Sequence, residues 1–333
     1  MLNKKLSNCY VGSNFNRIED DKLISGNGKF GADYVIPTNA LHVAVLRSDH
    51  ASAKIKEINI ENALKLEGVH SILTGKDFSK VSNPLLSVIR TNIKSWCCAI
   101  DKVYYVGEPI ALVLAENRYT AEDALDLIEV EYIVKKPIID LKDAIKSKTK
   151  IVHKELNSNV VSDRNFVYGN PKKFFSDDFK QVELEINYPR NSCTPLEGFV
   201  VHSNYDYHHK TFIIRSNFQG PYSLHSVLSR SLRTDEGKLR LISFNHSGGS
   251  FGIKQAVMPM IVLTGLASKI TNRYVVWIED RIEHLTSASS ATGRLTKIKA
   301  SVSSNGLINA INLNLPSSVL KDLDKTECKL YGP

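Results

Sequence analysis

Residues 247–255 read Ser-Gly-Gly-Ser-Phe-Gly-Ile-Lys-Gln and place a glycine-rich turn between two predictable elements. Alternating apolar residues over 238–244 predict a short strand, and apolar residues at helical spacing over 256–270 predict a helix. The three glycines allow positive φ angles and close approach to a ligand, and the start of a helix offers N–H groups to an anion. Turns of this kind are more often plain connections, but this one also suits a phosphate-bearing cofactor.

Two common nucleotide-binding motifs do not fit this turn. A Walker loop requires Gly-Lys-Ser/Thr after a four-residue gap, whereas Ile-Lys-Gln follows Gly252. The dinucleotide fingerprint requires glycines spaced as G-x-G-x-x-G, and Gly248, Gly249 and Gly252 are spaced differently. We therefore expect neither ATP nor NAD to bind here in the usual manner.

Length and composition are those of an ordinary globular protein with room for two domains. The chain has 333 residues, of which 42% are hydrophobic and 23% are charged. No run of about 18 apolar residues is found, so we expect no membrane span. The basic N-terminus lacks a following apolar segment, so we expect no secretion.

Charge and cysteine content exclude further classes of protein. The net charge of +8 is spread along the chain among acidic residues, without a basic cluster that contains aromatic residues, so we expect no nucleic-acid binding. The cysteines are odd in number and scattered, which predicts a reduced, cytoplasmic protein with inert thiols. They are Cys9, Cys97, Cys98, Cys193 and Cys328.

Hydrophobic periodicity predicts a mixture of strands and helices along the chain. Strands or strand-like apolar runs are expected at 40–47, 69–73, 109–115, 128–132, 181–188, 198–204, 211–216 and 274–279, with a hairpin at 295–302 and 307–315. Helices are expected at 60–66, at 121–127 with Thr120 as N-cap, and at 221–232, and residues 74–77 are expected to turn the chain. The run at 109–115 is continuously apolar, which is typical of a strand buried on both faces.

A charged segment near residue 145 predicts a domain boundary. We therefore expect a polar arm at 1–15, a first domain at 16–145 and a second domain at 146–333.

Four ordered groups of residues carry a resemblance to a known family. They are RIED at 17–20 with GNGKF at 26–30; VGEPIALVLA at 106–115; PLEG at 195–198 with NFQGP at 217–221; and GGSFGIK at 248–254. Together they resemble the large, molybdenum-cofactor-binding subunit of the molybdenum hydroxylases, the family of xanthine dehydrogenase, aldehyde oxidase and aerobic carbon monoxide dehydrogenase. The resemblance extends over nearly the whole chain, and 106–115 is its most specific stretch.

The resemblance implies an α+β fold, with an N-terminal α/β hammerhead domain followed by the first of two molybdopterin-binding domains. It also implies a molybdenum–molybdopterin cofactor, with the cytosine dinucleotide form as one alternative, and no protein side chain as a metal ligand. The implied reaction is oxidative hydroxylation of an aldehyde, an N-heterocycle or carbon monoxide. Electrons would pass to a 2Fe-2S small subunit and an FAD-binding medium subunit, so Fe-S and FAD belong to partner chains.

The resemblance also assigns candidate site residues. Gln219 matches the glutamine that hydrogen-bonds the apical oxo ligand of molybdenum, where an amide N–H donates without adding charge. Gln255 matches a position that faces substrate in some relatives. The remaining cofactor-binding candidates form the glycine-rich turn: Gly248, Gly249, Ser250, Phe251 and Gly252.

Two charged residues near these motifs have competing interpretations. Glu197 suits a catalytic base, but its place after a proline-containing turn favours a structural role. Lys254 either neutralises a cofactor phosphate or is a solvated lysine at a helix start.

The sequence departs from the family pattern in the turn and in length. Ser250 and Ile253 stand where the family has glycine, and a Cβ restricts φ and fills space beside a cofactor. The family's second cofactor-binding domain, with its general-base glutamate, is expected beyond Pro333. Two hypotheses follow: one part of an enzyme completed by a second chain, or a non-catalytic remnant or subunit-interaction protein without cofactor.

Overall fold

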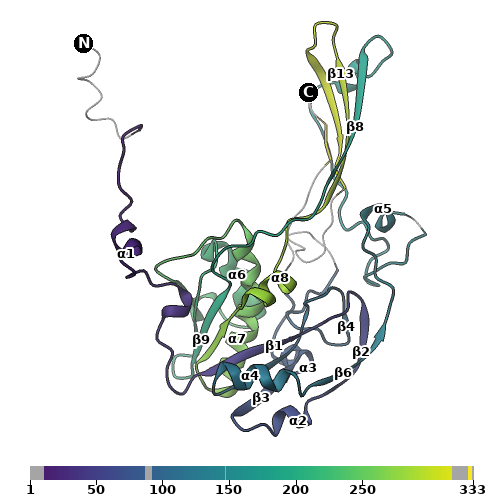
Figure 1. Ribbon diagram of the computed structural model, residues 1–333. Coiled ribbons are helices and arrows are strands. Elements are labelled where there is room, and N and C mark those ends of the chain that lie inside the picture. The colour runs from purple at the N-terminus through teal and green to yellow at the C-terminus, as the bar shows by residue number, and fades with distance from the viewer. Residues whose placement is uncertain (1–10, 87–91, 147, 317–328, 332–333) are drawn as a thin grey trace, which may run out of the picture.

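The computed structural model describes residues 11–86, 92–146, 148–316 and 329–331 (Figure 1). Helices and strands are mixed along the chain, which confirms the predicted α+β fold class. The largest element is a seven-stranded mixed sheet. Its strands, in spatial order, are β11 (Leu239–Ser243), β10 (Thr211–Ser216), β9 (Val200–Asp206), β12 (Val275–Ile278), β1 (Leu41–Arg47), β5 (Pro109–Ala115) and β3 (Val69–Thr74).

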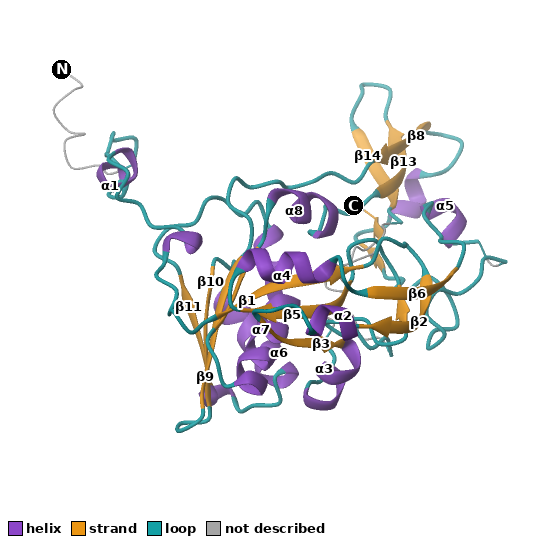
Figure 2. Cartoon of the chain, turned by 60° about the horizontal axis from the view of Figure 1, so that its bottom comes forward, coloured by secondary structure: helices purple, strands orange, loops and turns teal. Residues whose placement is uncertain are grey.

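The two faces of this sheet are covered by different helices (Figure 2). Every residue of β5 is buried, as the continuous apolar run predicts. Leu112 and Leu114 belong to a core cluster with α6 (Pro221–Ser231) and α7 (Met258–Thr271), while Val113 belongs to a second cluster with α2 (Glu61–Leu64) and α4 (Arg118–Leu125). Because strand side chains alternate between faces, β5 contributes to both hydrophobic layers.

Strands from both sides of residue 145 share the central sheet. β1 pairs in parallel with β12 through Leu41 and Val275, and antiparallel with β5. A short helix, α5 (Leu141–Ala144), lies at the predicted boundary, which remains a prediction.

Two smaller sheets and several short helices complete the described fold. The three-stranded sheet contains β4 (Lys102–Val103), β2 (Ala53–Asn59) and β6 (Glu129–Val134). The five-stranded sheet contains β7 (Asn165–Val167), β15 (Lys329–Tyr331), β14 (Ile308–Asn314), β13 (Arg294–Val302) and β8 (Lys180–Tyr188), and β13 and β14 form the predicted hairpin. The short helices include α1 (Asp20–Ile24), α2 (Glu61–Leu64), α3 (Gly75–Val81), α4 (Arg118–Leu125) and α8 (Arg281–Ser287).

Two local predictions are wrong about where helices begin, because both depend on which residue caps the helix. The residues predicted to turn the chain at 74–77 instead begin α3, where Asp77 Oδ2 accepts hydrogen bonds from the backbone N–H and hydroxyl of Thr74. Gly75 is required there, since an added Cβ would lie 1.9 Å from the carbonyl oxygen of Ala99. Helix α4 begins earlier than predicted, because Asn117 rather than Thr120 is its N-cap and accepts from the Thr120 N–H.

The helix after the glycine-rich turn also begins later than predicted. A 3-10 turn, η4 (Ile253–Val257), precedes α7, so the loop does not lie directly at the N-terminus of an α-helix. Together Ile253–Thr271 are long and apolar enough, by length and composition alone, to cross a membrane, although they are not an unbroken apolar run. In the fold, 67% of this stretch is buried, as in the core helix of a globular protein.

Candidate functional site

The glycine-rich turn connects β11 to η4 and has an unusual backbone. Gly249, Phe251 and Gly252 have positive φ angles of 97°, 52° and 90°. Phe251 is therefore held in a conformation that non-glycine residues rarely adopt, and the residue is 74% exposed. None of the four N–H groups from Gly249 to Gly252 donates to a protein acceptor within the described residues. The turn thus presents consecutive backbone donors, which suit an anionic or oxo-bearing ligand.

Gln219 lies beside this turn. It follows β10 and precedes α6, whose N-cap is Gly220 with a φ of 68°. The N–H of Gln219 donates to the carbonyl oxygen of Lys254 at 3.3 Å, and its side-chain Oε1 accepts from the Ser250 hydroxyl. The amide nitrogen of Gln219 therefore remains as a donor for a ligand.

Gln255 completes this group of side chains. It is exposed on η4, and its Nε2 lies 3.9 Å from the position that a Cβ on Gly220 would occupy. The structure thus brings together Gln219, Ser250 and Gln255, although they come from two separate segments.

The carboxylate of Glu197 holds the base of the turn in place. Its Oε2 accepts from the Gly248 N–H at 2.8 Å and from Lys254 Nζ at 2.6 Å, and its Oε1 accepts from the Gly31 N–H at 3.0 Å. Burial opposes ionisation of this carboxyl, but Lys254 and the two backbone donors outweigh it and lower the pKa of Glu197. Glu197 is thus an ionised structural anchor, as its sequence context favoured.

Both interpretations of Lys254 are wrong. Its side chain is 1% exposed and paired with Glu197, so it is neither solvated nor directed at a ligand phosphate. It is the only fully buried lysine among the largest buried side chains of the described residues. The burial of Lys254 could not be predicted from the sequence, because no residue next to it in the chain indicates a buried position.

The two departures from the family glycine pattern are compatible with the loop. Neither Ser250 nor Ile253 has a positive φ, so a side chain at these positions causes no backbone strain. Ser250 bonds Gln219, and Ile253 is packed in the hydrophobic core. By contrast, Gly248 tolerates no Cβ, which would lie 2.5 Å from the Cβ of Glu197.

A second buried acid–base pair lies next to Gly198 and is absent from the predicted site. Glu279 Oε2 accepts from the Phe199 N–H at 2.9 Å and lies 2.6 Å from His284 Nδ1. Both side chains are almost completely buried. The N-cap Asp280 at the start of α8 is the local sequence signal that marks this helix.

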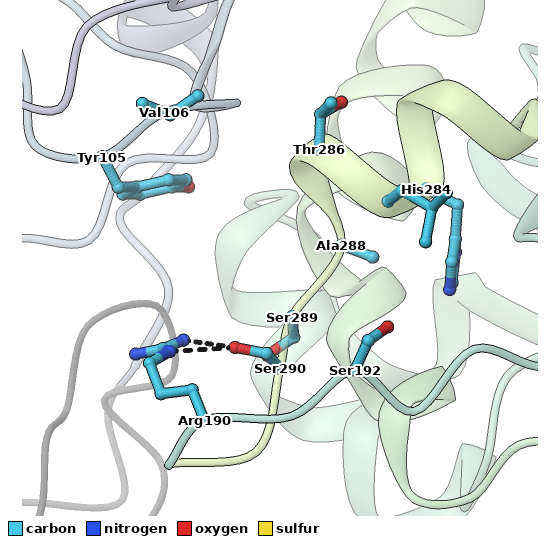
Figure 3. Close-up of a pocket in the computed structure, with 10 residues that line it drawn as sticks. Tyr105, Val106, Arg190, Ser192, His284, Thr286, Ala288, Ser289 and Ser290 are labelled. Atoms are coloured by element: carbon cyan, nitrogen blue, oxygen red, sulfur yellow. Dashed lines mark hydrogen bonds between the residues drawn. The ribbon is translucent and has the colours of Figure 1, made fainter. Parts of the chain in front are cut away.

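His284 also forms part of the wall of a cavity of about 220 Å³ (Figure 3). Tyr105 and Val106 line it from the first half of the chain. Opposite them, the Arg190 guanidinium donates to the Ser290 hydroxyl at 3.0 Å. No residue of the predicted site lines this cavity, so it is a separate feature.

No protein metal centre is found in the described part of the chain, and its two adjacent cysteines are buried. No group of three or more His, Cys, Asp or Glu side chains there could hold a metal ion. Cys97 and Cys98 are buried and unbridged, and burial raises the pKa of Cys97 to about 12.

The fold and the site define a class: an α+β chain with a glycine-rich loop whose free backbone donors face a glutamine amide. Comparison with known families agrees. Residues 25–136 match the "Aldehyde oxidase and xanthine dehydrogenase, a/b hammerhead domain", and residues 152–319 match the "Molybdopterin cofactor-binding domain". The chain belongs to the molybdenum hydroxylase family that includes aldehyde oxidase and xanthine dehydrogenase.

Individual relatives extend this result. The chain is 29% identical over 311 residues to the 6-hydroxypseudooxynicotine dehydrogenase complex subunit gamma of Paenarthrobacter nicotinovorans, covering 90% of this chain and 38% of that protein. It is 27% identical over 310 residues to the carbon monoxide dehydrogenase large chain of Hydrogenophaga pseudoflava, covering 89% of this chain and 38% of that protein. The structure of quinoline 2-oxidoreductase from Pseudomonas putida 86 matches with a TM-score of 0.82 and 27% identity, covering 91% of this chain and 39% of that one. The chain thus spans about two-fifths of the length of these relatives.

Proposed function

We propose that this chain is one part of the large subunit of a molybdenum-dependent hydroxylase or dehydrogenase and forms one wall of its cofactor pocket. The observation that carries the proposal is the loop at 249–252, whose unpaired N–H groups lie beside the amide of Gln219. Membership in a molybdopterin-binding family supports the proposal.

The residues present fit a molybdopterin cofactor. The loop offers donors without a positive charge, and Gln219 keeps its amide nitrogen available because Ser250 occupies its carbonyl oxygen. Gly252 adds space, since nothing lies within 4 Å of the position that a Cβ would occupy there. The cytosine dinucleotide form of the cofactor is our specific proposal, because extended phosphate groups suit consecutive backbone donors.

When bound, the cofactor would supply the oxidative hydroxylation chemistry. The chain's own residues would bind and orient it: Gly248, Gly249, Ser250, Phe251 and Gly252 through the loop, and Gln219 through a hydrogen bond to an oxo group. Gln255 lies beside Gly220 and is proposed to face the substrate. The substrate class is an aldehyde, an N-heterocycle or carbon monoxide.

The proposed partners follow from the composition of related complexes. One relative is named as subunit gamma of a dehydrogenase complex and another as a large chain. We propose a chain carrying the second molybdopterin-binding portion, an FAD-binding medium subunit and a 2Fe-2S small subunit, all in the cytoplasm.

The alternative is a subunit-interaction protein that holds no cofactor. In this alternative, the positive φ of Phe251 and the exposure of this residue would serve a contact with another protein. Cofactor content separates the two functions.

The decisive experiment isolates the tagged chain from its native source and measures molybdenum by mass spectrometry and pterin by fluorescence after oxidation. We expect both at a stoichiometry near one per chain, and a loss of at least ten-fold for Gln219→Ala and for Ser250→Ala. Ser226→Ala is the matched control, because Ser226 is exposed on α6 and its hydroxyl has no hydrogen-bond partner among the described residues. Metal-free and pterin-free protein would overturn the proposal in favour of the alternative.

A further inference from the structure

One face of the five-stranded sheet is apolar along β8 and across the facing centres of β13 and β14, with Thr296 and Arg294 of β13 opposite Ile186 and Tyr188. On β8, Val182, Leu184, Ile186 and Tyr188 point to the same side and are 48%, 56%, 42% and 48% exposed. The register continues this face across the sheet. Leu184 lies opposite Ile298 of β13, and Ile298 lies opposite Leu313 of β14. We call the face formed by these residues, with Ala300 and Ile311, the apolar arm face.

The opposite face of the same sheet carries charged side chains that form ion pairs with one another. Glu183 pairs with Lys299 at 3.0 Å, and Glu185 pairs with Lys297 at 3.5 Å. Lys142 at the start of α5 also reaches Glu185, at 2.8 Å. The sheet is therefore amphipathic, and only its apolar side lacks a second layer.

Within the part of the chain that the structure describes, no element provides that layer. β8 and β13 rise away from the helices of the body (Figure 1). None of the three hydrophobic core clusters contains a residue of β8, β13 or β14. Contiguous exposed apolar patches of this kind mark interaction sites.

We propose that the apolar arm face is the docking surface for a partner polypeptide that carries the remaining portion of a large subunit and lays helices across it. An antiparallel sheet with one apolar face is stabilised by helices on that face. Relatives that share this fold have the additional length to provide them, because the matched region is only 38% or 39% of their chains. This inference rests on the proposed function.

A site-specific photocrosslinker tests the contact directly. We would place p-benzoylphenylalanine at Leu184 in the tagged full chain, irradiate it in its native source and identify the crosslinked peptide by mass spectrometry. The matched control carries the crosslinker at Glu183, the next residue, which points to the charged face. We expect position 184 alone to crosslink, to a polypeptide that aligns with the relatives beyond the region matched by this chain.

A crosslink to a second copy of this chain, to a protein of another class, or to nothing would each overturn the inference. As a second measurement, Leu184→Glu should reduce the recovery of the partner at least ten-fold, while Glu183→Gln leaves it unchanged. Molybdenum content is measured separately on the same preparations. A crosslink from position 184 to the expected polypeptide without molybdenum would contradict the proposed function alone. Molybdenum together with a crosslink to a different protein would contradict the docking surface alone.

Discussion

Lys254 Nζ lies 2.6 Å from Glu197 Oε2, and this buried ion pair joins segments that are far apart in the sequence. The same carboxylate accepts the N–H groups of Gly31 and Gly248, so it fixes the entrance to the glycine-rich turn. The candidate cofactor loop therefore depends on a pair of charges that do not themselves face a ligand.

Removing one member of this pair should strongly destabilise the fold. Lys254→Met leaves the Glu197 carboxylate buried without its cation, which costs about 3–5 kcal/mol of unfolding free energy. The double variant Lys254→Met with Glu197→Gln removes both charges and should recover part of that loss. Urea unfolding measures both. Equal stability of Lys254→Met and the unsubstituted protein would show that the pair is not an anchor.

The steric limit at Gly248 predicts a second effect. An added Cβ would lie 2.5 Å from the Cβ of Glu197, so Gly248→Ala must displace the anchor and should cost about 1–3 kcal/mol. Gly237→Ala is the control, because nothing lies within 4 Å of its Cβ position and it should change stability by less than about 0.5 kcal/mol. Thermal and urea unfolding measure both effects. Equal losses of stability for the two substitutions would contradict the prediction.

Buried His202 predicts acid sensitivity in a defined pH range. Burial, with smaller contributions from Arg215 and His42, lowers the pKa of His202 from 6.5 to about 4. The unfolded chain then binds a proton that the folded chain does not, so stability is full above pH 6.5 and is lost as pH falls towards 4.

We expect this histidine to contribute a slope of up to about 1.4 kcal/mol per pH unit between these limits. His202→Gln should flatten the slope, whatever its effect on stability at neutral pH. Urea unfolding at half-unit pH steps measures it. An unchanged slope in the variant would assign the acid sensitivity to other groups. Protonation of Glu197 reduces stability only at lower pH, because the pKa of this carboxyl lies below its ordinary value.

The thiols should separate by burial in an alkylation experiment. Burial raises the pKa of Cys97 to about 12 and that of Cys98 well above its ordinary value, so neither forms the reactive thiolate at neutral pH. Peptide mass spectrometry after iodoacetamide treatment should find both unmodified in native protein and modified in urea. Cys193 is partly exposed and should react in the native state. Native labelling of Cys97 would contradict its placement in the core.

Much of the fold could be predicted, because its signals are local. The apolar run at 109–115 predicted the fully buried β5, and alternation predicted the β13–β14 hairpin. The start of α4 was missed because Asn117 and Thr120 both suit a cap, and only the observed hydrogen bond distinguishes them. The start of α7 was missed because η4 and α7 share one apolar pattern.

The candidate site could be predicted in part. Gln219 and the turn were identified through motifs, and their side-by-side placement agrees with one pocket wall, while their role in cofactor binding stays a prediction. The environment of Lys254 could not be predicted, because a lysine at the start of an apolar run is ordinarily solvated. The φ restriction expected at Ser250 and Ile253 does not arise, since the positive φ angles fall on Gly249, Phe251 and Gly252, while the effect of their side chains on a cofactor stays a prediction.

The sequence by itself determined the order of helices and strands, the glycine-rich turn and the family, because periodicity and short motifs are encoded within a few neighbouring residues. Only the tertiary structure decided which distant groups meet: Glu197 reaches Gly31, Gly248 and Lys254 across separations of 166, 51 and 57 residues. It also decided which charges are buried and which apolar face is left open. These outcomes depend on how the sheets and helices pack, and no local pattern contains that information.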